Sequence, residues 1–151
     1  MSAPTRKDSP GLTRRDEMAV SGAAMSEAPW AAAGAAGAVV TAGDLVLHLM
    51  TGHLALTGAL SAGSVAFFAV AAGGAVLSSR SGRAMRWARQ NPWRFAVLPG
   101  VACAMVVFVL SVMLGSSGVL GGAFTALWHG AAAYGLTGVA ASVGGGRRRR
   151  A

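Results

Sequence analysis

The hydrophobic positions of this chain lie in two long blocks that charged residues hardly interrupt. Asp44 is the only Asp, Glu, Lys or Arg between Ala28 and Ser79, and the stretch from Phe95 to Gly146 contains none. A helix crosses the hydrocarbon of a bilayer with about 20 apolar residues, so each block is long enough for two crossings. The pattern therefore predicts an all-α integral membrane protein.

Turn residues divide the two blocks into four predicted transmembrane helices. Thr51, Gly52 and His53 place small and polar side chains in the middle of the first block, and the sequence GSSG at 115–118 does so in the second. The four helices are predicted over residues 31–51, 57–77, 95–115 and 120–142. Together they form two helical hairpins within a transmembrane domain of residues 29–143.

The composition supports this class and excludes an ordinary soluble domain. Hydrophobic residues make up 54% of the chain and charged residues 12%, whereas a soluble domain contains about twice that charged fraction. The chain has no Ile and single Lys, Asn and Tyr residues beside twelve Arg. This usage avoids AT-rich codons and therefore favours a bacterial source with a GC-rich genome.

The positions of the basic residues predict the orientation. Lys and Arg occur only in residues 6–15, in the connection 78–94 and in the tail 144–151. With four spans, these three segments lie on one side of the membrane, and the two turns without Lys or Arg lie on the other. Because cytoplasmic segments carry the excess of Lys and Arg, we expect a plasma-membrane protein with both termini in the cytoplasm.

Residues 1–28 are predicted to be a disordered cytoplasmic segment. They mix Pro, Ser, Thr and Ala with both positive and negative residues, and their apolar residues do not recur at the regular spacing of a helix or a strand. The first basic residues are not followed by the apolar core that a signal peptide requires. Met18 and Met25 are alternative translation starts to Met1.

The connection between the second and third predicted spans indicates contact with anionic lipid. It contains five arginines and two tryptophans, and residues 82–90 suit a short helix in the headgroup layer. The tail contains four further arginines, each adding about 1 kcal/mol of attraction to an anionic leaflet. The residues expected to contact lipid are Arg83, Arg86, Arg89, Arg147 and Arg148. The simpler interpretation is that these arginines only fix topology. Nucleic acid is not expected as a partner, because the connection is tethered to a span at each end.

A polar stripe on the first predicted span contains its only carboxylate. Thr41, Asp44, His48 and Thr51 follow helical spacing, and a central Asp costs about 2.5 to 3.5 kcal/mol on insertion scales. Such a helix needs a partner for its polar face. His129, on the fourth predicted span, lies at nearly the depth of Asp44 by the rise of an α-helix. We therefore predict an intramembrane polar group of Asp44, His48 and His129, in which Asp44 pairs with His129.

The sequence leaves three interpretations of this polar group open. It is a hydrogen bond that joins helices, a proton- or ion-handling site, or a metal site. The spacing of Asp44 and His48 suits shared ligation, but no Cys or further carboxylate completes a metal motif, so we expect no metal and no other cofactor. No nucleophile motif, phosphate loop or pair of carboxylates is present, so the chain is not expected to be an enzyme.

Two stripes of small residues predict close contacts between helices. Small side chains at four-residue spacing let helix backbones approach each other in lipid. One stripe, on the second span, is Gly58, Ala62, Ala66 and Gly74; the other, on the fourth span, is Gly122, Ala126, Gly130 and Gly138. The sequence leaves open whether these stripes join helices of one chain or of two.

These features predict a small multi-pass membrane protein that is a non-catalytic accessory or structural component of a membrane complex. The alternative is a small oligomeric transporter, or a proton- or ion-conducting unit, that uses Asp44 and His129. The expected partners are anionic lipids together with either further copies of the chain or a larger membrane complex.

Overall fold

The computed structural model of the protein describes residues 14–26, 28–52, 55–78, 83–116 and 118–146. Every regular element in these ranges is an α-helix, so the predicted all-α class is confirmed. The helices are α1 (Arg14–Met25), α2 (Trp30–Met50), α3 (Leu56–Ser78), α4 (Arg83–Gln90), α5 (Pro92–Leu114) and α6 (Gly118–Gly146).

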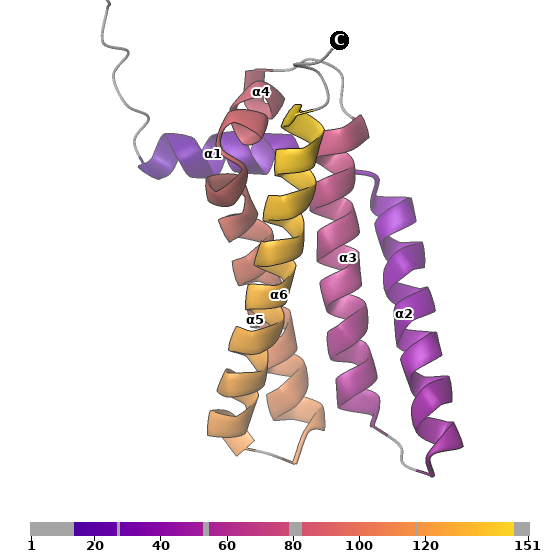
Figure 1. The fold of residues 1–151 in the computed structure, drawn as a ribbon. Helices are drawn as coiled ribbons and strands as arrows, with labels where there is room; N and C mark the ends of the chain where they lie inside the picture. Colours follow the sequence, from indigo (N-terminus) through magenta and orange to yellow (C-terminus); the bar gives the residue numbers. More distant parts are fainter. Residues whose placement is uncertain (1–13, 27, 53–54, 79–82, 117, 147–151) are drawn as a thin grey trace, which may run out of the picture.

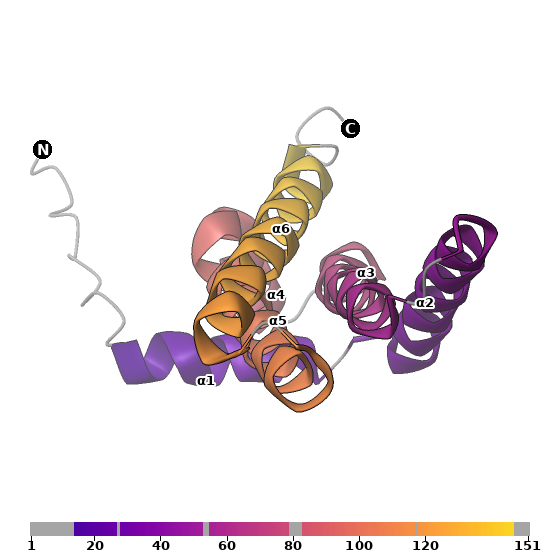
Figure 2. The ribbon, with the colours of Figure 1, turned by 90° about the horizontal axis from the view of Figure 1, so that it is seen from below.

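Four long helices stand side by side, and consecutive ones run in opposite directions (Figure 1). Viewed along the helices, α3 lies between α2 and the pair formed by α5 and α6 (Figure 2). Helix α1 lies crosswise at the end where α3 finishes and α5 begins, next to α4. The turns at the other end depend on glycine, because Gly52 and Gly118 have φ angles of 77° and 66° that other residues rarely adopt.

Three of the described helices are long and apolar enough to cross a membrane. They are Trp30–Met50, Leu56–Leu77 and Pro92–Leu114. Helix α6 is longer, with 29 residues, but its glycines and its Trp, His and Tyr residues lower its mean hydropathy, and it is not among the three. Length and composition therefore support a membrane protein with at least three helices suited to crossing.

Helix α1 corrects the prediction that residues 1–28 are disordered. Arg14–Met25 form a helix that packs against α3, α4 and α5, and Met25 contacts the buried cluster that includes Ala28. Most of the stability of a short helix in a protein comes from such packing and not from local propensity. The composition of the segment therefore did not reveal the helix. Residues 1–13 lie outside the described residues.

The connection 78–94 contains the predicted short helix. It was expected over residues 82–90 and is found at Arg83–Gln90. Asn91 then separates α4 from α5, and Pro92 occupies the first turn of α5, where its missing N–H costs no hydrogen bond.

The packing between α5 and α6 confirms the small-residue stripe predicted on α6. A Cβ added at Gly130 would lie 2.7 Å from Cβ of Ala104, and one added at Gly122 would lie 3.3 Å from Cβ of Ser111. At the other end of the pair, Gly138 lies directly against the ring of Trp93. The glycines therefore allow close approach along most of the pair.

The stripe predicted on α3 is confirmed only in part: its member Gly74 lies directly against the ring of Pro29, just before α2. Gly58 is exposed, and α2 approaches α3 at Gly63, where an added Cβ would lie 2.8 Å from the carbonyl oxygen of Gly37 and would overlap Oγ1 of Thr41. In a helix so rich in Ala and Gly, spacing alone did not single out Gly63.

Helix α3 is central and contributes to both buried clusters. Its residues Ala71, Ala72, Ala75 and Val76 pack with Phe95 of α5 and Ala141 of α6 near the end that α1 and α4 cover. Further along, Val65 and Phe68 of α3 pack against a second cluster of α5 and α6 residues, which contains Cys103, Val107, Ala126 and Ala133. Helix α2 contributes only Ala33 to these clusters.

Candidate functional site

The structure brings together Asp44 and His48, the two ionisable residues of α2. They lie four residues apart and therefore on one face of the helix. Nδ1 of His48 is 3.2 Å from the carboxylate oxygen Oδ2 of Asp44 and 2.8 Å from the main-chain oxygen of Asp44. A proton on Nδ1 is thus held by the backbone carbonyl and lies close to the carboxylate as well.

This acid–imidazole pair is partly exposed. The exposed fraction is 29% for the Asp44 side chain and 36% for the His48 side chain. Among the described residues, α2 packs against α3 alone, so no second helix covers the pair. Neither Nε2 of His48 nor Oδ1 of Asp44 has a hydrogen-bond partner within the described part of the chain.

The two threonines of the predicted polar stripe have structural roles. Thr41 points at α3, beside Gly63. Thr51 follows the last turn of α2, and its hydroxyl donates a hydrogen bond of 2.9 Å to the main-chain oxygen of His48. The stripe therefore continues the row of α2 residues that faces α3, and the partly exposed pair lies toward the end of that row.

His129 does not join this pair. Its Nδ1 lies 2.8 Å from the main-chain oxygen of Thr125 on its own helix, α6, and its main-chain oxygen accepts a hydrogen bond of 3.9 Å from Sγ of buried Cys103. Helices α2 and α6 make no contact, because α3 lies between them (Figure 2). The predicted pair of Asp44 with His129 is therefore not formed within one chain. Helical rise gave the depth of each residue but not the lateral order of the helices.

The described residues contain no group of three or more His, Cys, Asp or Glu side chains that could hold a metal ion. Asp44 and His48 alone provide two ligands from one helical turn. Structural and catalytic zinc sites use three or four protein ligands. The pair is therefore better suited to accepting a hydrogen-bonding partner than to holding a metal.

The basic residues of α4 differ in what they contact. Arg86 is exposed. Arg89 turns back to α3, where its Nη2 and Nε donate hydrogen bonds of 2.7 and 3.3 Å to the main-chain oxygen of Val76. The last carbonyls of a helix lack partners within the helix and carry partial negative charge, so this contact caps α3. The side chain of Arg83 and the tail residues Arg147 and Arg148 lie outside what the structure describes.

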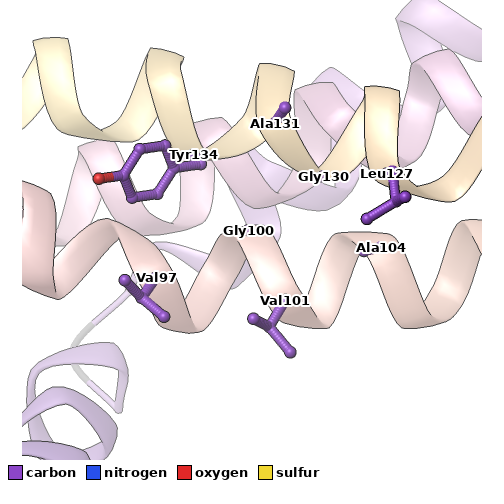
Figure 3. Close-up of a pocket in the computed structure, with 8 residues that line it drawn as sticks. All are labelled: Val97, Gly100, Val101, Ala104, Leu127, Gly130, Ala131 and Tyr134. Carbon is purple, nitrogen blue, oxygen red and sulfur yellow. The ribbon is translucent and has the colours of Figure 1, made fainter.

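Two grooves on the sides of the bundle are largely apolar. One, of about 270 Å³, follows the contact between α5 and α6, with Gly100 and Gly130 at its floor and Tyr134 at one end (Figure 3). The other, of about 320 Å³, lies between α2, α3 and α5. Its polar lining residues are Thr41 and Ser64, and the hydroxyl of Ser64 donates to the main-chain oxygen of Leu60. Neither groove is lined by an Asp, Glu, His, Lys or Arg side chain.

Comparison of the chain with models of known protein families, with curated proteins and with solved structures found no match. The candidate site therefore rests on the geometry of this chain, and its main elements are the Asp44–His48 pair and the basic end of the molecule.

Proposed function

We propose that the protein is a four-span component of the plasma membrane and that it acts as a non-catalytic accessory or structural subunit of a membrane complex. In this proposal α2, α3, α5 and α6 cross the bilayer as two hairpins. Helices α1 and α4 lie at the cytoplasmic surface.

The arrangement of the helix ends supports the four-span topology. Helices α1 and α4, the beginnings of α2 and α5 and the ends of α3 and α6 lie at one end of the molecule (Figure 1). Arg15, Arg86, Arg89 and Arg94 belong to that end, whereas the turns at 51–55 and 115–118 contain no Lys or Arg. With its 29 residues and its close contacts to α5, α6 is long enough to cross alongside its neighbour. The positive-inside rule then assigns the basic end to the cytoplasm.

Reporter fusions test this topology. A reporter that is active only in the cytoplasm should give signal when fused at Gly146 and no signal when fused after Gly52 or Gly118. Signal after Gly52 would contradict the four-span topology.

The observation that carries the accessory function is the position of the Asp44–His48 pair. It lies on the helix with a single neighbour, and it retains polar atoms without partners among the described residues. In contrast, the residues buried between α3, α5 and α6 are apolar or hydroxyl-bearing, with no charged side chain among those described. Polar groups at membrane depth join helices by hydrogen bonds. The partly exposed Asp44–His48 pair therefore suits contact with another membrane helix, whereas the apolar interior of one chain does not suit a transport pathway.

Crosslinking in the native membrane tests this function. A photo-crosslinking residue in place of Val40, near Asp44 on α2, should capture another membrane polypeptide, and Asp44→Leu should reduce the yield. The same residue in place of Val109 on α5, which is also exposed, serves as the control. Equal capture at both positions would contradict a specific role for α2.

A second candidate function is proton or ion conduction by an assembly of several copies. It is favoured by one observation, a titratable acid and imidazole 3.2 Å apart on a helix suited to crossing the membrane. Purified protein reconstituted into vesicles should then dissipate an imposed proton gradient, which a pH-sensitive dye inside the vesicles reports. Asp44→Asn should stop this dissipation while the helical content of the protein is retained. A gradient unaffected by the wild-type protein would contradict this candidate.

A further inference from the structure

We propose that the groove between α5 and α6 binds one anionic phospholipid from the cytoplasmic leaflet. An acyl chain lies along the groove, and the phosphate of the headgroup lies at Arg94, in the first turn of α5. The inference rests on the proposed topology in one respect, because it requires α5 and α6 to cross the membrane side by side.

The first argument is the shape of the groove. Gly100 and Gly130 bring the two backbones so close that a Cβ added at Gly130 would lie 3.0 Å from the carbonyl oxygen of Gly100. The side chains at the edges project outward, and the exposed fraction is 54% for Val101 and 70% for Leu127. The groove, of about 270 Å³, runs along the helix pair (Figure 3). A backbone floor between aliphatic edges fits an extended hydrocarbon chain, which makes dispersion contacts along its length.

The second argument is the chemistry at the end of the groove where α5 begins. Tyr134 has the only polar side chain in the lining of the groove, and its hydroxyl points toward that end (Figure 3). The ring centres of Tyr134 and Trp93 lie 5.5 Å apart, and the Trp93 ring packs directly against Gly138. Trp and Tyr gather at the level of the lipid headgroups. The groove therefore runs from hydrocarbon depth to the headgroup layer.

The third argument is a cation just beyond this aromatic end. Arg94, Val97 and Val101 follow the spacing i, i+3 and i+7 and therefore lie on one face of α5. Arg94 is exposed and lies about 4.5 Å, the rise of three residues, nearer the membrane surface than Val97. Its guanidinium has five N–H donors in a planar fork, enough to bind a phosphate in addition to a partner on the protein. The order of polar and apolar groups thus matches that of a phospholipid.

The two grooves of the molecule differ in charge more than in size. The groove between α2, α3 and α5 has a volume of about 320 Å³, but α2 and α3 contain no Lys or Arg. It therefore has no cation to select a headgroup. At the α5–α6 groove, Arg94 attracts a headgroup with net negative charge, whereas it repels the ammonium group of a zwitterionic lipid. We therefore expect a preference for anionic lipid at the α5–α6 groove only.

Photolabelling of the purified full-length protein in vesicles tests the site. The probes are phosphatidylglycerol and phosphatidylcholine with the same photoactivatable group in the middle of one acyl chain, and mass spectrometry maps the labelled residues. The phosphatidylglycerol probe should label the α5–α6 groove about fivefold more than the phosphatidylcholine probe does, by the attraction of one basic residue. The groove between α2, α3 and α5 is the internal control and should be labelled equally by both probes. Equal labelling of the α5–α6 groove by both probes would overturn the proposal.

Substitutions of Arg94 test the headgroup contact. Arg94→Gln should reduce phosphatidylglycerol labelling of the groove about fivefold and leave phosphatidylcholine labelling unchanged. Arg94→Lys keeps the charge and should retain most of the labelling. Arg86→Gln removes the same charge from the exposed surface of α4 and should leave labelling of the groove unchanged. Equal losses in Arg94→Gln and Arg86→Gln would mean that the whole basic end attracts lipid, and the specific site would be overturned.

Filling the groove tests the contact with the acyl chain. Ala131 of α6 lines the groove and is exposed, so Ala131→Phe should place a ring where the chain lies. The phosphatidylglycerol probe should then no longer label the groove. Ala35→Phe is the matched control, because Ala35 is an exposed alanine of α2 that lines neither groove, and this variant should be labelled as the wild type is. Full labelling of the groove in Ala131→Phe would contradict the acyl-chain site.

A photo-crosslinking residue in place of Leu127 identifies the occupant of the groove in the native membrane. The chain should gain the mass of a phospholipid, and an adduct with a polypeptide instead would overturn the lipid site.

These outcomes are separable from failure of the proposed function. Signal from a cytoplasmic reporter fused after Gly118 would contradict the crossing of α5 and α6. If that fusion gives no signal and both probes label the groove equally, only the lipid site is overturned. Capture of a membrane polypeptide at residue 40 tests the accessory function independently of either result.

Discussion

The two side-by-side helix pairs of this protein differ in how they are held together. Helices α5 and α6 approach each other at glycines distributed along their length, from Gly138 beside Trp93 to Gly122 beside Ser111. The close glycine contacts of α2 with α3 run from Gly74, beside Pro29, only as far as Thr41 and Gly63. Beyond that point α2 carries the Asp44–His48 pair. The comparison indicates that small residues hold α5 to α6 along most of their length, whereas α2 is closely held to α3 only over the part before Asp44.

The largest effect is expected from breaking the α5–α6 contact. In Gly130→Ala, the new Cβ would lie 2.7 Å from Cβ of Ala104 and 3.0 Å from the carbonyl oxygen of Gly100, neither of which can move without shifting a helix. We expect a loss of about 2 to 3 kcal/mol in the free energy of unfolding, measured by titration with a denaturing detergent. Gly135→Ala on the same helix is the control, since no atom lies within 4 Å of its Cβ position. Equal losses in both variants would contradict the packing described.

A smaller effect is expected from the corresponding change at the α2–α3 contact. In Gly63→Ala the new methyl group meets the Thr41 hydroxyl, which can rotate, and the carbonyl oxygen of Gly37, which cannot. We expect a loss of about 1 to 2 kcal/mol and a lower yield of disulfides engineered between α2 and α3. Disulfides engineered between α5 and α6 should form as in the wild type. If both helix pairs lose crosslinks together, the two pairs are not separate units.

Arg89 and Arg86 allow a matched test of the segment that links the two pairs. Arg89→Gln removes the two hydrogen bonds to Val76 and should lower stability by about 1 kcal/mol, because the last turn of α3 loses its cap. Arg86 is exposed, so Arg86→Gln should leave stability unchanged and should reduce binding to vesicles that contain anionic lipid. Thermal unfolding and vesicle co-sedimentation measure the two effects. Identical behaviour of the two variants would contradict the different contacts of these arginines.

The smallest effect is expected from a hydroxyl buried within the core. Thr137 of α6 is fully buried, and its Oγ1 has no hydrogen-bond partner among the described residues. Thr137→Val keeps the side-chain shape and removes this unsatisfied group, so stability should rise by about 0.5 to 1 kcal/mol. The same detergent titration measures the gain. A loss of stability would indicate that the hydroxyl has a partner in the membrane.

The sequence was informative wherever neighbouring residues decide the structure. The two nearly charge-free blocks and the turns at 51–53 and 115–118 located the helices to within a few residues, and four-residue spacing identified the face of α6 that contacts α5. Residues distant in sequence were harder to place. The hydrogen bonds from Arg89 to Val76 span 13 residues, and the folding of α1 depends on packing against three other helices. The pairing of Asp44 failed for the same reason, since helical rise fixes depth but not which helix lies next to which.

Cys103 gives access to the opening kinetics of the α5–α6 pair. The thiol is fully buried, and it is the only cysteine of the chain. Its reaction with a membrane-permeant maleimide therefore requires a local opening that moves α5 away from α6, so the labelling rate reports how often the pair separates. The wild-type chain thus contains its own single-site probe of this motion. Labelling should be fast in Gly130→Ala and slow in Gly63→Ala, if the two helix pairs open independently.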